Sequence, residues 1–414
     1  MKHLFKLALA GAAVTAAFSA TAATTLTVAS FPSFDRAVKE ALPLWKKAHP
    51  DIEIKLVSLN YGDHHTAMTT ALATGSNLPD VMAVEVGFIG RFAESGGLED
   101  LSKAPYSALP NQSKFFAFTY PQAMGHANGL AAIPADIGPG TMFYRKDLMD
   151  KAGISEADLT KSWEGYIESG KKLKTSTGAY LLAHASDIQG IYIRSGLKDG
   201  QGVYFDKDGK TLVDTPRFQK AFELAKAARA AGIDAKIGAW SNEWSEGFKT
   251  NKIASQMMGA WLAGHLADWL APATKGLWRS SNLPGGSFGS YGGSFYAIAK
   301  KAQNKTEAWE FIKFMTLNKE VQINSFRTLD AFPALIEAQK DGFTDQPMEF
   351  LGGQKARQLW RDISVKIPAI KVDKFDPIAA EIVNAELENV LEQGKDVKTA
   401  LADAKTMIEK RVRR

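Results

Sequence analysis

In the first hundred residues, short hydrophobic runs typical of strands alternate with segments in which hydrophobic residues have the spacing of a helix. Short β-branched or alternating runs predict strands at 25–30, 52–57 and 81–84. Between the first two runs, Val38, Leu42 and Trp45 recur at a spacing of three or four residues, which predicts a helix. Strands that alternate with helices in this way predict an α/β fold, in which helices cover a parallel or mixed sheet.

The remainder of the chain is patterned mainly for helices. These are predicted at 163–174, 216–230, 307–317 and over most of 377–412. Asp208-Gly209, placed between two short apolar runs, predicts a β-hairpin, and residues 295–299 predict a further strand. The chain is long enough for two domains of ordinary size. Because it has no internal repeat and no low-complexity linker, we expect a boundary that is compact or crossed several times.

The first 23 residues have the three parts of a secretory signal. Lys2 and Lys6 precede an apolar run at 7–18, and small residues follow at 19–23. The apolar run is too short to span a bilayer, so we expect cleavage near Ala23 and export. The chain has no cysteine, which excludes disulfides, thiolate metal sites and a lipid-modified cysteine. We therefore expect a protein that is free in the periplasm.

The distribution of charged residues and histidines argues against a nucleic-acid partner and against a metal site. The formal net charge is +5, and loss of the two signal lysines leaves +3. Because the basic residues are spread along the chain, we expect no nucleic-acid partner. The histidines are scattered or directly adjacent, so we expect no metal site and no cofactor.

Aromatic residues supply the strongest sign of a ligand. Five of the nine tryptophans lie between residues 240 and 278. Trp269 and Trp278 are expected in the core, whereas Trp240 and Trp244 lie in a polar, loop-like stretch and Trp261 follows a predicted strand that ends in glycine. Flat rings in such places suit a sugar, whose C–H groups pack on indole while its hydroxyls need polar partners.

Several segments resemble the sugar-binding proteins of bacterial ABC importers, the extracellular solute-binding family that includes maltose-binding protein. They occur in family order over nearly the whole mature chain: Pro79-Asp80-Val81-Met82, Phe92 to Leu98, Ile133 to Asp136, Met142 to Leu148, Ser162-Trp163-Glu164, Met258-Gly259-Ala260-Trp261, Gly292-Gly293-Ser294 and Phe332-Pro333-Ala334. The resemblance implies two α/β lobes, a hinge crossed more than once, and a sugar bound in the cleft between the lobes. It also implies delivery to permease subunits in the inner membrane. The residues themselves show no catalytic constellation, so we expect no enzyme.

The resemblance sets expected boundaries and site residues. After a signal peptide at 1–23, the N-terminal lobe would comprise 24–134 and 292–330, and the C-terminal lobe 135–291 and 331–414. In an open α/β sheet, ligands bind beyond the carboxyl ends of the strands, which indicates Ser30, Phe31, Glu85 and Trp261. The family pattern implies that Glu85 accepts hydrogen bonds from sugar hydroxyls and that Trp261 stacks on the ring.

Further candidates follow from the same pattern. Gly293 and Ser294 match a segment whose backbone approaches the ligand, and Asp136 is either a ligand contact or a hinge residue. His64 is either an aromatic contact or a surface helix residue. The complete set of predicted ligand-binding residues is Ser30, Phe31, His64, Glu85, Asp136, Trp240, Trp261, Gly293, Ser294, Arg327 and Phe375, the last where maltose-binding protein has another stacking aromatic. Arg145 replaces the asparagine that is usual in the family.

Two alternatives remain open from the sequence. The first is an exported glycoside hydrolase that uses two cleft carboxylates. The second is a binding protein for an anionic sugar, sulfonated or phosphorylated, held by Arg327 or Arg194. For each binding-protein reading we expect a monomer, because a moving cleft and a permease-facing surface leave little room for an obligate interface.

Overall fold

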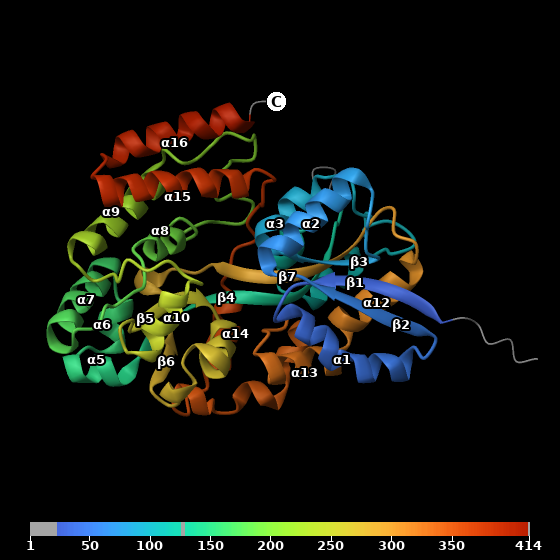
Figure 1. Cartoon of the computed structure of the whole chain (residues 1–414), viewed down its shortest axis with the longest axis horizontal. Coiled ribbons are helices and arrows are strands. Elements are labelled where there is room, and N and C mark those ends of the chain that lie inside the picture. The colour runs from blue at the N-terminus through green and yellow to red at the C-terminus, as the bar shows by residue number, and fades with distance from the viewer. Residues whose placement is uncertain (1–22, 126–128, 413–414) are drawn as a thin grey trace, which may run out of the picture.

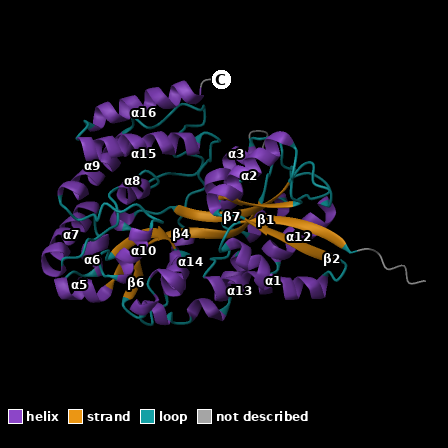
Figure 2. Ribbon diagram, viewed as in Figure 1, coloured by secondary structure: helices purple, strands orange, loops and turns teal. Residues whose placement is uncertain are grey.

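The computed structural model describes residues 23–125 and 129–412 of the chain (Figure 1). The predicted signal segment therefore lies outside the described residues, apart from Ala23. None of the described helices is long and apolar enough to cross a membrane. The fold is a two-lobed α/β structure built around one continuous sheet, which runs through both halves (Figure 2).

The N-terminal lobe is built by alternation of strands and helices, as the periodicity predicted. Its first elements are β1 (Thr24–Ser30), α1 (Phe34–Ala48), β2 (Ile52–Ser58), α2 (Tyr61–Thr74), β3 (Val81–Glu85) and α3 (Val86–Ala93). Strand β1 is parallel to both β2 and β3, and helices α12 (Lys305–Leu317) and α13 (Lys319–Leu329) complete the lobe. Helix α2 begins at Tyr61, three residues after the end of β2.

The C-terminal lobe carries most of the remaining elements. Its helices are α5 (Lys146–Ala152), α6 (Glu156–Thr160), α7 (Trp163–Thr177), α8 (Ser186–Tyr192), α9 (Pro216–Ala230), α10 (Asn242–Lys249), α11 (Leu262–His265), α14 (Ala356–Ser364), α15 (Asp376–Gln393) and α16 (Val397–Val412). A short helix, α4 (Thr119–Gln122), precedes the lobe in the chain. Helices α15 and α16 lie side by side and pack on α9 (Figure 1).

Two long strands connect the lobes. The sheet has the order β2-β1-β3-β7-β4-β5, with β6 (Trp278–Ser281) also paired to β4. The first half of β4 (Ile133–Arg145) pairs with β7 (Ser290–Ile298), whereas its second half pairs with β5 (Ser255–Gly259) and β6. The chain crosses a third time beside β4, where Ile137 N–H donates to Phe332 O at 2.8 Å. The hinge is thus crossed more than once, as expected.

The lobes also contact one another outside the strands. A Cβ placed on Gly90 of α3 would lie 2.7 Å from a methyl carbon of Val372, in the segment that leads to α15. On α1, Arg36 pairs with Asp268 at 3.4 Å. These contacts join the N-terminal lobe to two different parts of the C-terminal lobe.

Three local expectations fail for reasons of tertiary packing. Trp244 lies in helix α10 and is fully buried, not in a loop, because that helix turns it onto the core. Trp269 is 46% exposed, whereas Trp278 is buried as expected. The Asp208-Gly209 turn forms, but Phe205 and Thr211 make only an isolated bridge and no ladder follows. Burial of these flanks against α9 takes the place of strand pairing.

Candidate functional site

The strand register places three polar side chains in one row at the junction of the lobes. Glu85 ends β3 and is opposite Ser294 of β7, and Ser294 is opposite Asp136 of β4. Gly293 pairs with Ile137 in the same register. Four of the predicted site residues therefore meet where the two crossing strands pass from one lobe to the other.

Glu85 is held as the N-cap of α3. Its Oε2 accepts hydrogen bonds from Gly87 N–H at 2.7 Å and from the Tyr61 hydroxyl at 2.9 Å. Burial raises the pKa of Glu85, and the charge of Asp136 adds to this, while the two hydrogen bonds and Arg194 oppose it. The Tyr61 ring is 45% exposed. Sequence reasoning missed Tyr61, although an aromatic residue at the end of a strand-to-helix loop was an available signal.

Asp136 is short of hydrogen-bond donors. Burial raises its pKa to about 6, although hydrogen bonds from Ser294 act in the opposite direction. Its Oδ1 is buried and has no hydrogen-bond partner among the residues that the structure describes. The same holds, within that described part, for the Ser30 hydroxyl at the end of β1. Buried polar atoms without partners are candidates for contact with a polar ligand or water.

Phe31 and His64 support this region from within the core. The Phe31 ring is 7% exposed and packs against Phe34 and Tyr61, with centroid distances of 5.5 and 5.6 Å. His64 is 1% exposed, and its Nε2 lies 2.7 Å from Ala83 O. The alternative that His64 is a surface residue is wrong, because α2 turns its side chain towards strand β3.

On the C-terminal side, Trp261 is fixed by the backbone of β7. Its indole N–H donates to Tyr291 O at 2.8 Å. Gly292, at φ +85°, leaves room for this contact, because a Cβ there would lie 2.8 Å from the indole nitrogen. The indole of Trp240 lies nearly parallel to that of Trp261, at a centroid distance of 5.8 Å. Both predicted tryptophans therefore lie together, and Trp261 contacts β7 three residues before Ser294.

Arg194 is the cation that faces this junction. Its guanidinium lies 5.6 Å from the centroid of the Tyr291 ring and donates to Gly190 O at 2.7 Å. Its charge acts on both Glu85 and Asp376. Burial raises the pKa of Asp376 to about 7. Acidic groups from both lobes therefore lie near Arg194.

Two predicted residues lie elsewhere. Arg327 of α13 pairs with Asp341 at 3.0 Å and is half-exposed. Phe375, next to the start of α15, is partly buried and packs against Phe205 at a centroid distance of 6.4 Å, at the edge of the core of the C-terminal helices. The structure does not group either side chain with Trp261. Arg145 is buried and pairs with Asp147 and Asn251, so it holds together the local structure around β4.

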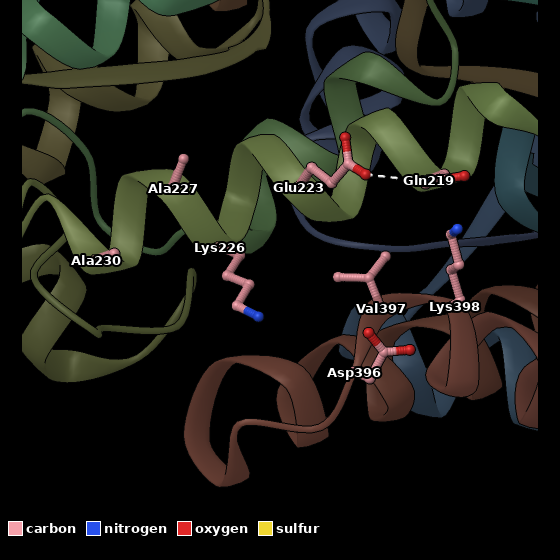
Figure 3. Close-up of a pocket in the computed structure, with 8 residues that line it drawn as sticks. All are labelled: Gln219, Glu223, Lys226, Ala227, Ala230, Asp396, Val397 and Lys398. Atoms are coloured by element: carbon pink, nitrogen blue, oxygen red, sulfur yellow. Dashed lines mark hydrogen bonds between the residues drawn. The ribbon is translucent and has the colours of Figure 1, made fainter.

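Other features give no competing site. Within residues 23–125 and 129–412, no group of three or more potential protein ligands could hold a metal ion. A pocket of about 400 Å³ lies between α9 and the start of α16, and none of the predicted site residues lines it (Figure 3). Its charged side chains, two lysines and two acids, are those of an ordinary solvated surface: Glu223, Lys226, Asp396 and Lys398.

Comparison of the whole chain with known proteins identifies its family. Residues 26–322 match the family described as bacterial extracellular solute-binding protein. The lactose-binding protein of Rhizobium radiobacter is 26% identical over 359 residues, which cover 83% of this chain and 82% of that protein. The arabinooligosaccharide-binding protein of Bacillus subtilis (strain 168) is 25% identical over 382 residues, with coverage of 87% and 86%.

A solved structure supports the same assignment at the level of the fold. A crystal structure described as extracellular solute-binding protein family 1 superimposes with a TM-score of 0.81 at 23% identity, covering 94% of this chain and 99% of that one. The continuous family match and the shared two-lobed fold agree with the resemblance drawn from the sequence. The chain belongs to the bacterial extracellular solute-binding protein family.

Proposed function

We propose that this protein is the periplasmic carbohydrate-binding component of an ABC importer. It captures a neutral mono- or oligosaccharide between its lobes and delivers it to permease subunits in the inner membrane. The signal segment at 1–23 directs export, and the mature protein acts as a monomer without catalysis. The relatives named for lactose and for arabinooligosaccharides support a carbohydrate as the ligand.

One observation carries the proposal: acceptor groups and flat aromatic rings lie at the two ends of one short stretch of β7. Ser294, at one end, is opposite Glu85 and Asp136, while the backbone of Tyr291, at the other, holds Trp261. A sugar ring needs both kinds of contact at once. Its C–H face packs on indole, and its hydroxyls donate to carboxylates. Asp136 Oδ1, which has no hydrogen-bond partner among the described residues, is a candidate for such an acceptor.

Closure of the lobes supplies the mechanism of capture. In this proposal the N-terminal lobe (24–134 and 292–330) brings Glu85, and the C-terminal lobe (135–291 and 331–414) brings Trp240 and Trp261. A ligand that contacts both lobes binds the closed state better than the open state, and it therefore shifts the population towards closure. The strands that cross between the lobes are the natural hinge, because they absorb small dihedral changes without loss of either core.

The charges favour a neutral ligand over an anionic one. Arg194 lies close enough to Glu85 and Asp376 to lower the pKa of each, so it already faces acidic groups of both lobes. Arg327 is paired with Asp341. An anionic sugar beside Glu85 and Asp136 would also meet carboxylates, which repel it.

A thermal-unfolding screen of the mature protein tests the proposal. We would use neutral, phosphorylated and sulfonated sugars, and recover each sugar afterwards. A ligand that binds only the folded state stabilises it by about 2.7 kcal/mol at a hundredfold excess over Kd. Stabilisation by a neutral sugar that is recovered unchanged supports the proposal. Stabilisation only by charged sugars, or conversion of the sugar into products, contradicts it in favour of the anionic-sugar or hydrolase alternative.

A further inference from the structure

Glu85, His65 and Tyr61 form a closed ring of hydrogen bonds. The backbone N–H of Glu85 donates to His65 Nε2 at 3.1 Å. His65 Nδ1 lies 2.8 Å from the Tyr61 carbonyl oxygen, and the Tyr61 hydroxyl donates to Glu85 Oε2 at 2.9 Å. The ring begins and ends on Glu85, so it fixes both the backbone and the carboxylate of that residue.

We propose that His65 is a positioning residue for ligand binding, which acts by orienting the Glu85 carboxylate and the Tyr61 hydroxyl. It does so without contact to the ligand, because its side chain is fully buried. This inference rests on the proposed function, in which Glu85 accepts hydrogen bonds from a sugar. It assigns the role to the second histidine of the pair, whereas the sequence pattern had pointed to His64.

The packing of the imidazole supports a rigid role. It stacks on Phe88, in the first turn of α3, at a centroid distance of 4.1 Å and an interplanar angle of 12°. It also packs against Tyr61 at 4.7 Å and Phe31 at 5.3 Å. One side chain thereby ties the first turn of α2 to the first turn of α3, with Glu85 between them.

The hydrogen-bond partners determine the tautomers of both histidines. His65 faces a donor at Nε2 and a carbonyl at Nδ1, so it must be neutral with the proton on Nδ1. His64 faces the Ala83 carbonyl at Nε2, so it must carry a proton there. Burial lowers the pKa of His65 to about 4, with a smaller effect from His64, which keeps the required neutral form at neutral pH.

Nitrogen-15 NMR of the wild-type imidazoles gives the first test. We expect a protonated Nδ1 and an unprotonated Nε2 for His65 at pH 7, and a protonated Nε2 for His64 in the same sample. This readout needs no ligand, so it tests the ring independently of the proposed function. A protonated Nε2 on His65 would remove the acceptor for Glu85 N–H and overturn the inference.

Affinity measurements by calorimetry give the second test, once the screen has identified a sugar. His65→Phe keeps the stack on Phe88 but leaves Glu85 N–H without an acceptor, and we expect about tenfold weaker binding. His65→Gln, whose amide oxygen can accept that hydrogen bond, should recover part of the loss. His49→Phe is the matched control, because His49 also stacks on an aromatic ring, that of Trp45 at 4.0 Å.

The outcomes are separable. If the wild type binds no sugar, the proposed function is wrong, but the NMR result still decides whether the ring of hydrogen bonds through His65 exists. If His65→Phe binds as tightly as the wild type, the positioning role is wrong. If His65→Phe does not fold, Tyr61→Phe replaces it. This variant opens the hydrogen-bond ring only at the bond between the Tyr61 hydroxyl and Glu85, and unchanged affinity would then contradict the role.

Discussion

The indole of Trp240 lies nearly parallel to the indole of Trp261, with an angle of 18° between the planes and 5.8 Å between the ring centroids. The two side chains are held very differently. Trp261 is partly buried and hydrogen-bonded to the backbone, whereas Trp240 is 55% exposed and has a backbone φ of +70°. Positive φ is uncommon for a bulky residue and often accompanies function. The pair therefore combines a partly buried, hydrogen-bonded ring with a more exposed one that packs on the edge of the core at Trp244.

Removal of either ring should weaken sugar binding, with different effects on stability. For Trp261→Ala we expect a loss of about 1–2 kcal/mol of binding free energy, roughly 5- to 30-fold in Kd, and a smaller loss for Trp240→Ala. Trp240→Ala should change the free energy of unfolding by less than about 0.5 kcal/mol, because the ring is exposed. Calorimetry measures the change in Kd, and urea denaturation measures the change in the free energy of unfolding. Trp269→Ala, which removes another exposed tryptophan, is the control and should bind normally.

Gly292 should be required for the position of Trp261. Gly292 and Gly276 both have φ +85°, but a Cβ on Gly276 would meet nothing within 4 Å, whereas one on Gly292 would meet the Trp261 nitrogen. Alanine at either position should cost about 1 kcal/mol of stability from backbone strain. Only Gly292→Ala should also weaken sugar binding, as titration of the two variants would show. Equal affinities in the two variants would contradict this account of Trp261.

Asp187 should make the protein less stable as pH rises from about 4 to 7. Burial raises its pKa to about 7, against a hydrogen bond from Gln256 Nε2 at 2.9 Å. The folded state therefore holds a proton that the unfolded state has released in this range, so stability falls as pH increases and levels off above 7.

Asp187→Asn keeps an acceptor for Gln256 and removes the charge. Chemical denaturation between pH 4 and 8 should show a flatter profile for the variant, with stability at pH 8 equal to or above that of the wild type. Other groups also titrate in this range, so the difference between variant and wild type is the quantity to compare. A difference that does not change with pH would be inconsistent with the raised pKa.

Arg229 should be far more important for stability than an exposed cation. It bonds to both carboxylate oxygens of Asp234, at 3.1 and 2.9 Å, and also to Glu392 and His184. The Asp234 side chain is 1% exposed. Arg229→Ala should cost about 3–5 kcal/mol, because it leaves a buried carboxylate with the Ala185 N–H but without its cationic partner.

Lys146→Ala is the matched comparison for Arg229→Ala. Lys146 pairs with Asp150 at 2.7 Å, but both side chains are about half exposed. Its removal should change the free energy of unfolding by no more than about 1 kcal/mol. Urea denaturation of the two variants measures the contrast, and similar losses in both would show that burial of the Arg229 pair is not decisive.

Patterns confined to a few neighbouring residues predicted the elements well. Strand β1 and helix α9 occur where the periodicity placed them, because the spacing of their apolar residues already defines the face to be buried. The prediction of a hairpin at 203–213 was correct only for its turn. Whether the two flanking segments pair with each other depends on the other elements that pack against them, here helix α9. Similarly, Trp269 and Trp278 are both apolar aromatic residues, and only the packing of the lobe decides which one is buried.

The sequence by itself determined the α/β class, the approximate order of strands and helices, and the family to which the chain belongs. These follow from local periodicity and from short segments in a fixed order. Only the tertiary structure decided that Glu85, Ser294 and Asp136 stand in one row and that Arg327 pairs elsewhere. It also decided that His65 bonds to Glu85 while His64 bonds to Ala83. The physical reason is that strand register and helix rotation arise from contacts between residues far apart in the chain, which no local pattern encodes.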